Sequence, residues 1–402
     1  MKHPHNWKIK TLEDVAEIQT GLSKCASRVG DFVRLPYLRV ANVQDGRFDL
    51  TEVKEIDVPK DAVDRYRVVL GDLLLTEGGD FDKLGRGALW TGAIKECVHQ
   101  NHIFVVRANS SVLDRRFLAL QTQGAHGRAY FQSCSKQSTN LASINSTQLK
   151  QFPVLLPPLP EQRKIADILG TWDEALEKLD ALIAAKERRN QALMQQLLFG
   201  KIRVGGFSKR WRVRTLADIV KPVTRTVSKP KDSFMAAGIR SHGKGVFLKP
   251  DFEPEDIALE ELFEIQTDDL IVNITFAWEG AAAVVPASAN GALVSHRFPT
   301  FRVSSSDADL SFIRHYILTK RFVFDCGLAS PGGAGRNRVL SKAAFLAIEL
   351  NLPDVAEQRA IGATLDTAAA ELRLLRDRRA VVDEQKRGLM QKILTGKVRV
   401  SA

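Results

Sequence analysis

Residues 157–204 read PPLPEQRKIADILGTWDEALEKLDALIAAKERRNQALMQQLLFGKIRV, and residues 353–400 repeat the stretch as PDVAEQRAIGATLDTAAAELRLLRDRRAVVDEQKRGLMQKILTGKVRV. The two copies align without a gap, so that Glu161 matches Glu357. A repeat separated by almost half of the chain indicates a duplicated domain-sized unit, because solenoid repeats are much shorter. We therefore expect the chain to build one unit twice.

Each copy predicts one long helix with an apolar face. Gly200 and Gly396 follow the last apolar residues, where a left-handed C-terminal cap is favoured. Pro160 suits a first helical turn, and Asp354 and Glu357 are spaced as a capping box. The apolar positions of the first copy step by three and four residues and are Ile165, Leu169, Trp172, Leu176, Leu179, Ile183, Leu193 and Leu197. The second copy keeps this register at Ile361, Leu365, Ala368, Leu372, Leu375, Val382, Leu389 and Ile393.

This register is typical of two helices wound around each other, because a seven-residue repeat keeps one apolar stripe facing the partner helix. The alternative is two amphipathic helices that lie on separate cores. If the first helix leaves one globular block and the second returns, the pair is antiparallel. Asn190 then faces Ala368, and Lys186 faces Leu372. We expect the ammonium of Lys186 to reach outward, since burying an unpaired charge is costly.

The duplication extends into the globular blocks. The segment NWKIKTL at residues 6–12 recurs as RWRVRTL at residues 210–216, and GDLLLTEGG at residues 71–79 is echoed by DDLIVNITF at residues 268–276. Short apolar runs broken by Gly, Asp and Asn predict strands and turns in both blocks. The two units thus follow each other as in a circular repeat, with Met1 and Ala402 at the boundary between them. We therefore expect the two termini to lie close together.

These patterns predict an α+β protein with two globular domains joined by two long helices that form an antiparallel coiled coil. The two halves would be related by a pseudo-twofold axis, as in a cyclic repeat. The predicted globular domains are residues 1–156 and 205–352. The predicted spacer helices are residues 157–204 and 353–402.

The charge balance favours a polyanionic partner. The chain has 402 residues, a formal net charge of +11 and a pI near 9.5. Such a field attracts nucleic acid first, and a basic surface kept for solubility is the alternative. No run approaches the ~18 apolar residues of a membrane span, and residues 1–10 hold no apolar signal core. We therefore expect a cytoplasmic protein, in which Cys25, Cys97, Cys134 and Cys326 are reduced thiols without a CxxC pair.

The sequence carries no recognisable catalytic motif: GxxxxGK[ST], GxGxxG after a strand and HExxH are all missing. His99 and His102 have a metal-like spacing but lack a third ligand. Asp80 and Asp82 are better explained as solvated turn residues, and the glycines of residues 332–335 are too irregular to cradle a phosphate. We therefore expect a chain that binds a partner, with no catalytic residue and no metal site.

The candidates for nucleic-acid contacts are basic and polar residues on the glycine-rich connections within the two blocks. Arginine reads guanine edges, asparagine reads adenine edges, and lysine mostly holds phosphate. In the first block the candidates are Lys24, Arg28, Arg34, Arg39, Asn42, Lys83, Arg86, Lys136 and Asn140. In the second block they are Arg225, Arg240, His242, Lys244, Arg336, Asn337 and Arg338. The clusters carry this prediction more than any one member, since a single charge is often only solvated.

The chain resembles the specificity subunits of Type I restriction–modification systems. The resemblance lies in LPPLPEQRKIADIL with LMQQLLFGKIRV, in the second copies LPDVAEQRAIGATL and LMQKILTGKVRV, and in LPYLRVANV with GDLLLTEGG. It spans essentially the whole chain. The second copy departs from the usual proline-rich helix entry, since Asp354, Val355 and Ala356 stand there.

That resemblance implies a non-catalytic subunit whose two target-recognition domains each read one half of a bipartite site in double-stranded DNA. The two helices would set the spacing and dock two methyltransferase (modification) subunits, and restriction/translocase subunits would complete the complex. S-adenosylmethionine, ATP and Mg would be held by these partners, with no cofactor in this chain. The expected docking residues lie at the helix starts and are Glu161, Gln162, Arg163, Glu357, Gln358 and Arg359.

Two other functions fit the same residues. The chain could be the specificity half of a Type II-like enzyme whose partner combines methylase and nuclease. It could also be a structural coiled-coil adaptor that does not touch DNA, although the basic charge and the loop-rich blocks argue against this function.

Overall fold

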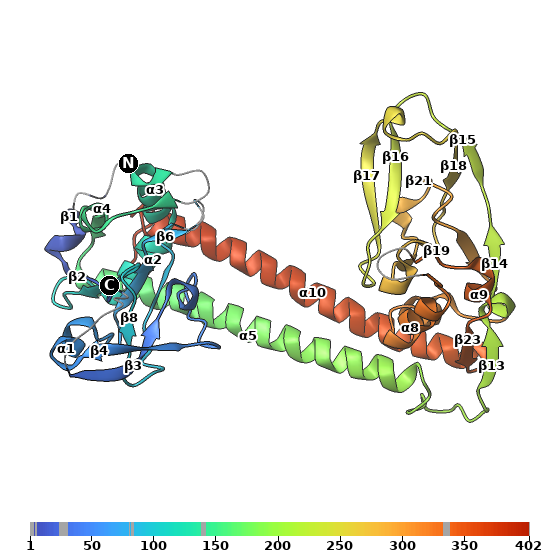
Figure 1. The fold of residues 1–402 in the computed structure, drawn as a ribbon, viewed down its shortest axis with the longest axis horizontal. Coiled ribbons are helices and arrows are strands. Elements are labelled where there is room, and N and C mark those ends of the chain that lie inside the picture. Colours follow the sequence, from blue (N-terminus) through green and yellow to red (C-terminus); the bar gives the residue numbers. More distant parts are fainter. Residues whose placement is uncertain are drawn as a thin grey trace. The chain divides into compact units, whose positions relative to one another are not determined.

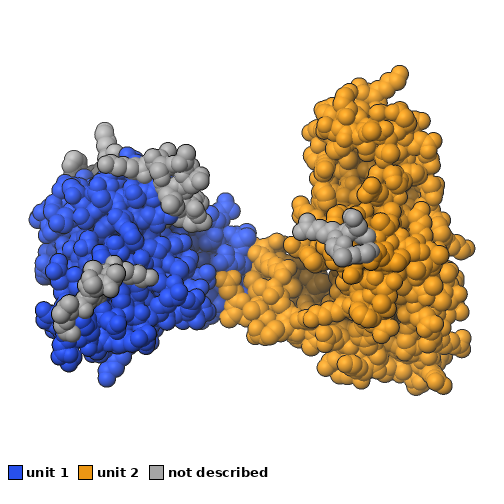
Figure 2. Space-filling view, in the orientation of Figure 1, with its two compact units in different colours: residues 1–179, 378–402 blue, residues 180–377 orange. Residues whose placement is uncertain are grey.

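The chain divides into two compact units in its computed structural model (Figure 2). Unit 1 consists of residues 1–179 and 378–402, and unit 2 consists of residues 180–377. The division passes through both long helices, so each unit contains one globular block and a part of each helix. The structure describes residues 4, 6–23, 31–79, 81, 84–137, 142–332 and 338–401.

The globular block of unit 1 is built from short strands and a few helices (Figure 1). Its strands are β1 (Lys8–Thr11), β2 (Ala16–Thr20), β3 (Phe32–Leu38), β4 (Lys54–Pro59), β5 (Leu73–Thr76), β6 (Gly78–Gly79), β7 (Gly87–Leu89), β8 (Val98–His99), β9 (Ile103–Ala108), β10 (Lys136–Gln137), β11 (Ala142–Ser143) and β12 (Pro153–Leu156). Its helices are η1 (Leu12–Asp14), η2 (Val40–Asn42), η3 (Lys60–Ala62), α1 (Val63–Tyr66), α2 (Arg115–Gln123), α3 (Ala125–Cys134) and α4 (Ser146–Lys150). The sheets have the orders β2-β9-β5-β7, β4-β3-β8, β10-β11-β6 and β1-β12.

The globular block of unit 2 follows a similar order. Its strands are β13 (Arg212–Thr215), β14 (Val220–Val223), β15 (Thr226–Ser228), β16 (Phe234–Ile239), β17 (Val246–Phe252), β18 (Glu261–Glu264), β19 (Asp269–Val272), β20 (Ala282–Val284), β21 (Leu293–Val294), β22 (Thr300–Val303) and β23 (Glu349–Leu352). Its helices are α6 (Leu216–Ile219), η5 (Pro254–Asp256), η6 (Ala277–Glu279), η7 (Ala287–Ala289), α7 (Leu310–Tyr316), α8 (Lys320–Leu328) and α9 (Lys342–Leu346). The sheets have the orders β14-β22-β19-β20, β15-β18-β21-β16-β17 and β13-β23.

The two blocks therefore share a framework. The sheet β2-β9-β5-β7 of unit 1 corresponds to β14-β22-β19-β20 of unit 2, and the antiparallel pair β1-β12 corresponds to β13-β23. The inner strands β5 and β19 are buried along their whole length, as their apolar LLLT and DLIV sequences favour. Helices α2 and α7 begin alike, because the Asp114 and Asp309 side chains each accept two backbone N–H groups of the first turn.

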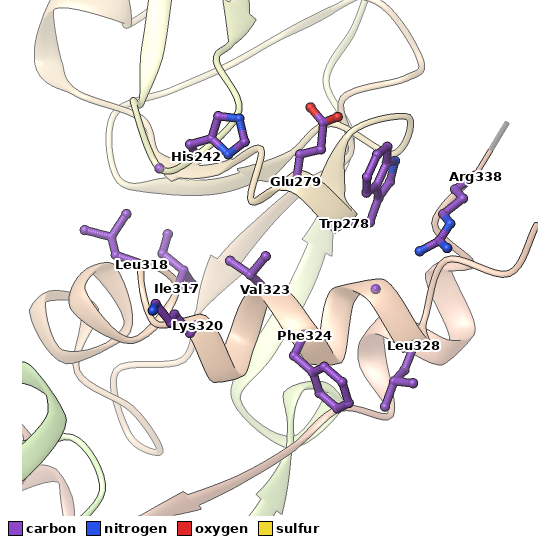
Figure 3. Close-up of a pocket in the computed structure, with 12 residues that line it drawn as sticks. His242, Trp278, Glu279, Ile317, Leu318, Lys320, Val323, Phe324, Leu328 and Arg338 are labelled. Atoms are coloured by element: carbon purple, nitrogen blue, oxygen red, sulfur yellow. The ribbon is translucent and has the colours of Figure 1, made fainter. Parts of the chain in front are cut away.

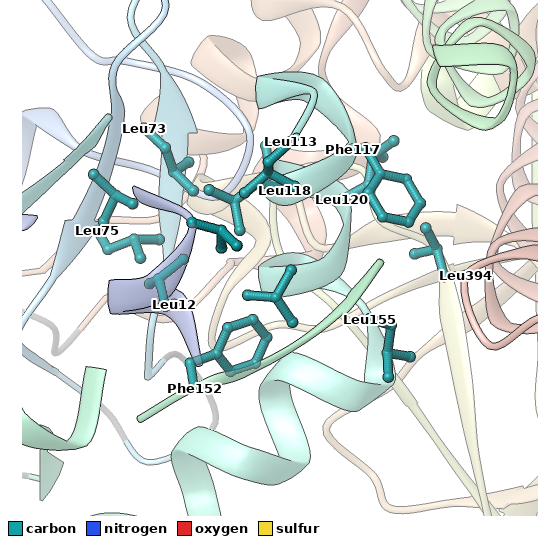
Figure 4. Close-up of a cluster of buried hydrophobic side chains, with 14 of the residues drawn as sticks. Leu12, Leu73, Leu75, Leu113, Phe117, Leu118, Leu120, Phe152, Leu155 and Leu394 are labelled. Atoms are coloured by element: carbon teal, nitrogen blue, oxygen red, sulfur yellow. The ribbon is translucent and has the colours of Figure 1, made fainter. Parts of the chain in front are cut away.

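Each unit buries its own apolar core, and the long helices contribute to both cores. In unit 1 the core joins η1, β5, α2 and β12, and Leu394 packs into it just after the second long helix (Figure 4). Ile165 and Leu169 of the first long helix belong to the same cluster. In unit 2 the cluster includes Ile361 and Leu365 of the second long helix. The helix starts are thus tied to the globular blocks by apolar burial, the main stabilising force in a core.

The two long helices are α5 (Leu159–Leu197) and α10 (Val355–Ile393), each with 39 residues. Gly200 and Gly396 have φ of 66° and 71°, so the predicted left-handed caps are confirmed. The predicted capping box is half right. The Asp354 carboxylate accepts from the Glu357 backbone N–H at 3.0 Å, but the Glu357 carboxylate binds other groups.

Within unit 2 the segments of α5 and α10 run antiparallel. Asn190 Nδ2 donates to the Ala368 carbonyl at 2.9 Å, as the predicted register requires. The Lys186 ammonium binds the carboxylate of Glu371, the residue next to Leu372, which it was predicted to face. The carboxylate of Glu371, whose side chain is 41% exposed, neutralises this ammonium on the neighbouring helix, so Lys186 is not an unpaired buried charge. All predicted seam residues of both helices are buried or half-buried.

The chain ends lie together in unit 1, as the cyclic repeat predicts. Arg399 Nη1 donates to Asn6 Oδ1 at 2.9 Å, and the guanidinium of Arg399 lies 6.0 Å from the ring centre of Trp7. In the described part of the chain, no helix combines the length and the apolar character that a membrane crossing requires.

Candidate nucleic-acid interface

The helix start in unit 1 is held by a set of contacts that we call the unit 1 clamp, formed by Glu161, Gln162 and Arg399. Glu161 is 3% exposed, and its carboxylate accepts from Arg399 Nε and Nη2 at 2.8 Å each. Gln162 is 1% exposed, accepts from the Asp114 backbone N–H at 2.8 Å and donates to the Val112 carbonyl at 2.9 Å. These contacts fasten the start of α5 to the chain end and to the entry of α2.

Unit 2 repeats these contacts in the unit 2 clamp, formed by Glu357, Gln358 and Arg203. The Glu357 carboxylate accepts from Arg203 Nη2 at 2.5 Å and from the indole N–H of Trp211 at 3.3 Å. Gln358 accepts from the Asp309 backbone N–H at 2.9 Å. Both side chains are 1% exposed.

The clamps correct the predicted docking residues. Glu161, Gln162, Glu357 and Gln358 are internal, and their polar atoms are engaged within their own units, so they do not form an outer docking face. Arg163 and Arg359 are exposed and stay predictions for partner contact. The recurrence of these polar residues in both copies is explained by the clamps rather than by a partner.

A buried carboxylate at the start of the central strand is a second shared feature. Asp72 is 1% exposed and accepts from Arg107 Nε and Nη2 at 2.8 Å each. Asp269 is fully buried, accepts from Arg225 Nη1 at 2.7 Å and lies 2.9 Å from Arg302 Nη2. The predicted DNA contact of Arg225 is therefore corrected, because its guanidinium is committed to neutralising Asp269.

Unit 1 contains a cavity of about 620 Å³, which we call the unit 1 cavity. Three parts of the chain enclose it: the loop after η2, the segment before β7, and the corner between α2 and α3. The lining residues are Gln44, Asp45, Arg47, Leu84, Gly85, Arg86, Thr122, Gln123 and Arg128. Arg128 Nη2 binds Asp45 at 2.8 Å, and the Gly46 backbone N–H donates to the Gly87 carbonyl at 2.9 Å, so the enclosing loops are fastened together.

Arg86 is the predicted DNA-contact residue that the unit 1 cavity includes. Its guanidinium makes only long contacts, 3.4 Å from Nη1 to Gln44 Oε1 and 3.4 Å from Nη2 to the Val40 carbonyl. Arg47 is exposed beside it. Loosely held arginines among side-chain amides match what a major-groove reader needs, because guanidinium and amide groups bind base edges.

Unit 2 contains a cavity of about 750 Å³, the unit 2 cavity (Figure 3). The lining residues are His242, Gly243, Trp278, Glu279, Ile317, Leu318, Lys320, Val323, Phe324, Gly327, Leu328 and Arg338. Figure 3 shows His242, Glu279 and Trp278 on one side of the cavity and helix α8 on the other. The guanidinium of Arg338 lies 5.4 Å from the ring centre of Trp278, within cation–π range.

The β16–β17 turn places three predicted residues at this cavity or beside it: Arg240, His242 and Lys244 are all exposed on the turn. His242 has φ of 62°, a left-handed conformation that is uncommon for a residue with a side chain. Its backbone N–H donates to the Glu279 carbonyl at 2.8 Å, and Ser241 Oγ donates to Glu279 Oε2 at 2.9 Å. These bonds hold the turn against η6.

The two cavities occupy equivalent places in the shared framework. The β3–β4 and β16–β17 connections supply one wall, the segments before β7 and β20 supply the second, and the α2–α3 and α7–α8 corners supply the third. Their linings differ in chemistry, because the unit 1 cavity is mostly polar while α8 adds Phe324 and Leu328, which are 61% and 70% exposed.

The remaining predicted contacts fall elsewhere. Arg34 is exposed on β3 with its Nε 2.8 Å from Glu55 Oε2, and Arg39 pairs with Glu52. The structure contradicts the prediction for Asn42, which is 2% exposed and donates to the carbonyls of Asp49 and Glu52, so its amide cannot meet a base. Lys136 lies on β10. Lys24, Arg28, Lys83, Asn140, Arg336 and Asn337 lie outside the described residues.

The two histidines with metal-like spacing each contact a protein group of their own. His99 is fully buried with Nδ1 3.1 Å from the Tyr66 carbonyl, and burial lowers its pKa to about 4. His102 pairs with Glu77 instead. In the described part of the chain, no three His, Cys, Asp or Glu residues are grouped as metal ligands.

Sequence reasoning missed Arg47, Arg128, Trp278 and Phe324 as lining residues. Arg128 and Phe324 lie on short helices after the central strands, where the sequence signal was only helical. Arg47 and Trp278 lie in connections whose cavity role depends on three separate segments that meet in the fold.

Comparison with known proteins gives one consistent family. Residues 4–187 match the model of the Type I restriction modification DNA specificity domain. The Methanocaldococcus jannaschii protein named type I restriction enzyme MjaX specificity subunit is 23% identical, over 99% of this chain and 95% of that protein. The type I restriction enzyme MjaVIII specificity subunit of the same organism is 21% identical, over 100% and 95%.

The fold has solved counterparts as well. The crystal structure of the HsdS subunit from Thermoanaerobacter tengcongensis aligns over 99% of both chains, with a TM-score of 0.52 and 16% identity. The alignments with the two Methanocaldococcus jannaschii proteins extend over 99% and 100% of this chain, and the structural match shows the same fold. The chain is therefore similar over its whole length to specificity subunits of Type I restriction–modification systems, and residues 4–187 match their DNA specificity domain.

Proposed function

We propose that this chain is the non-catalytic DNA-recognition subunit of a Type I restriction–modification complex, and that each unit reads one half of a bipartite DNA site. The observation that carries the proposal is the pair of cavities. They stand at equivalent places on a duplicated framework, and their linings have diverged. Two domains that read different base sequences require the same framework and different surface residues. The contacts to bases determine which sequence is bound, and the framework only positions those contacts.

The chemistry of the two linings suggests different readouts. In the unit 1 cavity Arg47 and Arg86 can donate paired hydrogen bonds to guanine edges. In the unit 2 cavity Phe324 and Leu328 offer apolar contact of the kind that thymine methyl groups accept. The net charge of +11 supports phosphate contacts around both.

The two long helices are proposed to form an antiparallel coiled coil that sets the gap between the half-sites. In this proposal the target-recognition domains are residues 1–156 and 205–352, and the spacers are residues 157–204 and 353–402. The antiparallel contacts within each unit support it, such as Asn190 with Ala368 in unit 2 and Lys386 with Asp173 in unit 1.

The full complex is proposed to contain two methyltransferase subunits, one per unit, together with restriction/translocase subunits. S-adenosylmethionine, ATP and Mg would be held by these partners. The two equivalent clamps support the stoichiometry, because they give both units the same framework at the helix starts.

Methylome sequencing of cells that carry the variant chain with its methyltransferase tests the base readers. Arg47→Ala with Arg86→Ala should relax base identity in one half of the motif only. Trp278→Ala with Phe324→Ala should relax the other half only. Lys178→Ala, an exposed change on α5, is the matched control and should leave the motif intact. Relaxation of both halves by either pair would contradict the assignment.

A second experiment tests the spacer. A seven-residue insertion after Leu179 together with one after Leu375 lengthens each helix by about 10 Å, roughly three base-pair steps. The unspecified gap should widen while both base sets stay the same. A changed base set with an unchanged gap would contradict the proposed role of the helices.

A further inference from the structure

The connection between β3 and β4 contains a tight hairpin that reaches the unit 1 cavity. Val43 bridges to Phe48, and the Gln44 backbone N–H donates to the Arg47 carbonyl at 2.9 Å. Gly46 has φ of 72°, a left-handed conformation that glycine adopts without strain. Val43 is fully buried, whereas Arg47 is exposed. The base of the hairpin is therefore fixed in the core, and its tip carries an arginine at the cavity.

A closed ring of hydrogen bonds ties the hairpin tip to two other segments. The Gly46 backbone N–H donates to the Gly87 carbonyl at 2.9 Å, and Gln123 Nε2 donates to the same carbonyl at 3.1 Å. The Gln123 carbonyl accepts from Arg128 Nε at 3.0 Å, and Arg128 Nη2 donates to Asp45 Oδ2 at 2.8 Å. We call Asp45, Gly46, Gly87, Gln123 and Arg128 the unit 1 ring. It joins the hairpin, the start of β7 and the α2–α3 corner.

The two arginines that are proposed to contact bases each stand next to a glycine of this ring. Arg47 follows Gly46, and Arg86 precedes Gly87. The backbone of Arg86 is also held by the sheet, because the Thr76 backbone N–H donates to its carbonyl at 2.9 Å. The bond between the two glycines therefore sets the distance between the two arginines at the backbone.

Arg128 is suited to holding the ring closed. Its guanidinium donates to two segments at once, and one acceptor is the carbonyl of the last residue of α2, an end of a helix that attracts cations. The side chains of Arg128 and Asp45 are 52% and 55% exposed, and an exposed ion pair contributes little to stability. The geometry that the pair imposes on the hairpin is therefore its main consequence.

Unit 2 fastens the corresponding turn with different residues. The backbone N–H groups of His242 and Gly243 donate to the carbonyls of Glu279 and Gly280 at 2.8 and 3.1 Å, and Ser241 Oγ donates to Glu279 Oε2 at 2.9 Å. The side-chain bond goes to η6 in unit 2, whereas in unit 1 it crosses to α3. In both units the turn is thus held beside the edge strand of the shared sheet, which is β7 or β20.

We propose that the unit 1 ring positions Arg47 and Arg86 as a fixed pair for base readout, and that Arg128 and Gln123 are positioning residues that act through these arginines. The inference rests on the proposed function, which takes the two arginines as base readers. A paired contact to a base edge requires a guanidinium placed to within about 0.5 Å. Opening the ring lets the hairpin tip shift relative to β7, so discrimination between bases falls although no base contact has been removed.

The test measures binding of the co-purified complex of this chain and its methyltransferase to DNA duplexes, by fluorescence anisotropy at one salt concentration. Methylome sequencing supplies the motif, and each duplex of the comparison set has one base pair changed. Arg128→Met should lower discrimination by ~10-fold at the positions read by Arg47 or Arg86 and leave the other half of the motif unaffected. Gln123→Met removes the bond from its amide to Gly87 and should act in the same direction. Arg128→Lys keeps a cation for Asp45 and should retain more discrimination than Arg128→Met.

Two controls separate positioning from folding. Lys60→Met removes another exposed ion pair of the same block, from Lys60 Nζ to Asp31 Oδ2 at 2.9 Å, and should leave discrimination unchanged. Arg128→Met should melt like the unchanged chain. In a chain that already carries Arg47→Ala, Arg128→Met should cause a smaller loss than it does alone, because residues that act through one another are not additive.

Three results would overturn the proposal. The first is unchanged discrimination in both Arg128→Met and Gln123→Met. The second is an equal loss of affinity for every duplex with a weaker salt dependence, which would assign Arg128 to a phosphate. The third is a loss at a base position that Arg47→Ala and Arg86→Ala leave intact, which would make Arg128 a base reader. If the unchanged chain and its methyltransferase methylate no bipartite motif, the proposed function itself fails, and that result precedes any variant.

Discussion

The clamps and the cavities differ in how well the two units preserve them. In the clamps, Glu161 with Arg399 and Glu357 with Arg203 use the same residue types and the same pairing. In the cavities, the walls come from equivalent segments, yet polar residues line one and exposed aromatic and aliphatic residues border the other. A contact that holds the framework tolerates little change, because removing one partner leaves a buried charge unpaired. The residues of a cavity wall that contacts a ligand can change when the ligand changes.

Among the features that the two units share, the buried aspartates have the largest expected effect on the free energy of unfolding. Asp269→Ala removes the carboxylate shared by Arg225 and Arg302, and we expect a loss of about 3 kcal/mol in the free energy of unfolding of unit 2. Asp72→Ala frees one arginine, Arg107, and we expect about 2 kcal/mol in unit 1; each aspartate also accepts one backbone N–H, from Val69 or Gln266, so the number of arginines is the difference between the two. Urea unfolding followed by circular dichroism measures both. Equal losses would mean that the second arginine adds nothing to the framework.

The clamp carboxylates have the next largest expected effect on stability. Glu161→Gln and Glu357→Gln keep the side-chain volume but remove the charge that binds Arg399 or Arg203, so each should lower Tm by roughly 2–4 °C. The arginine contacts are duplicated, but Glu357 also accepts from the Trp211 indole N–H, so the shift for Glu357→Gln should equal or exceed the shift for Glu161→Gln. Differential scanning calorimetry gives the comparison. A shift for one clamp and none for the other would show that only one of them is structural.

The sequence predicts the shared framework well and the site poorly. The helix ends at Gly200 and Gly396 and the contact of Asn190 with Ala368 follow from local spacing and from the repeat, which are visible in one dimension. Glu161 was misassigned because its partner, Arg399, lies at the other end of the chain, and a recurring polar residue looks the same whether it faces a partner or the interior.

The cavity linings were only partly predictable for the same reason. Arg86 and His242 stand in basic, glycine-rich loops and could be chosen by composition. Arg47 and Phe324 belong to the cavities only because separate segments meet there, and no short-range pattern marks that meeting. Asn42 has the composition of a base reader, but its burial is set by a loop that closes over it.

The ion pair between the two long helices has the smallest expected effect on stability, and this effect depends on pH. The hydrogen bond from Lys186 holds the pKa of the Glu371 carboxyl below its usual value of 4.5. The carboxylate therefore contributes stability that is present above the unfolded-state pKa and is lost as the pH falls through the lowered folded-state pKa. Glu371→Gln should melt below the unchanged chain at pH 7, and the two should converge at pH values below the folded-state pKa. A difference that persists at low pH would show that the ionised pair is not its source.

The most direct test of independent reading is an exchange of residues 1–156 for the matching block of a relative, followed by methylome sequencing of cells that carry the hybrid and its methyltransferase. We predict that one half of the methylated motif changes, while the other half and the gap between them stay as in the unchanged chain. A hybrid that methylates a motif altered in both halves would contradict the account, because the two units would then not read DNA separately.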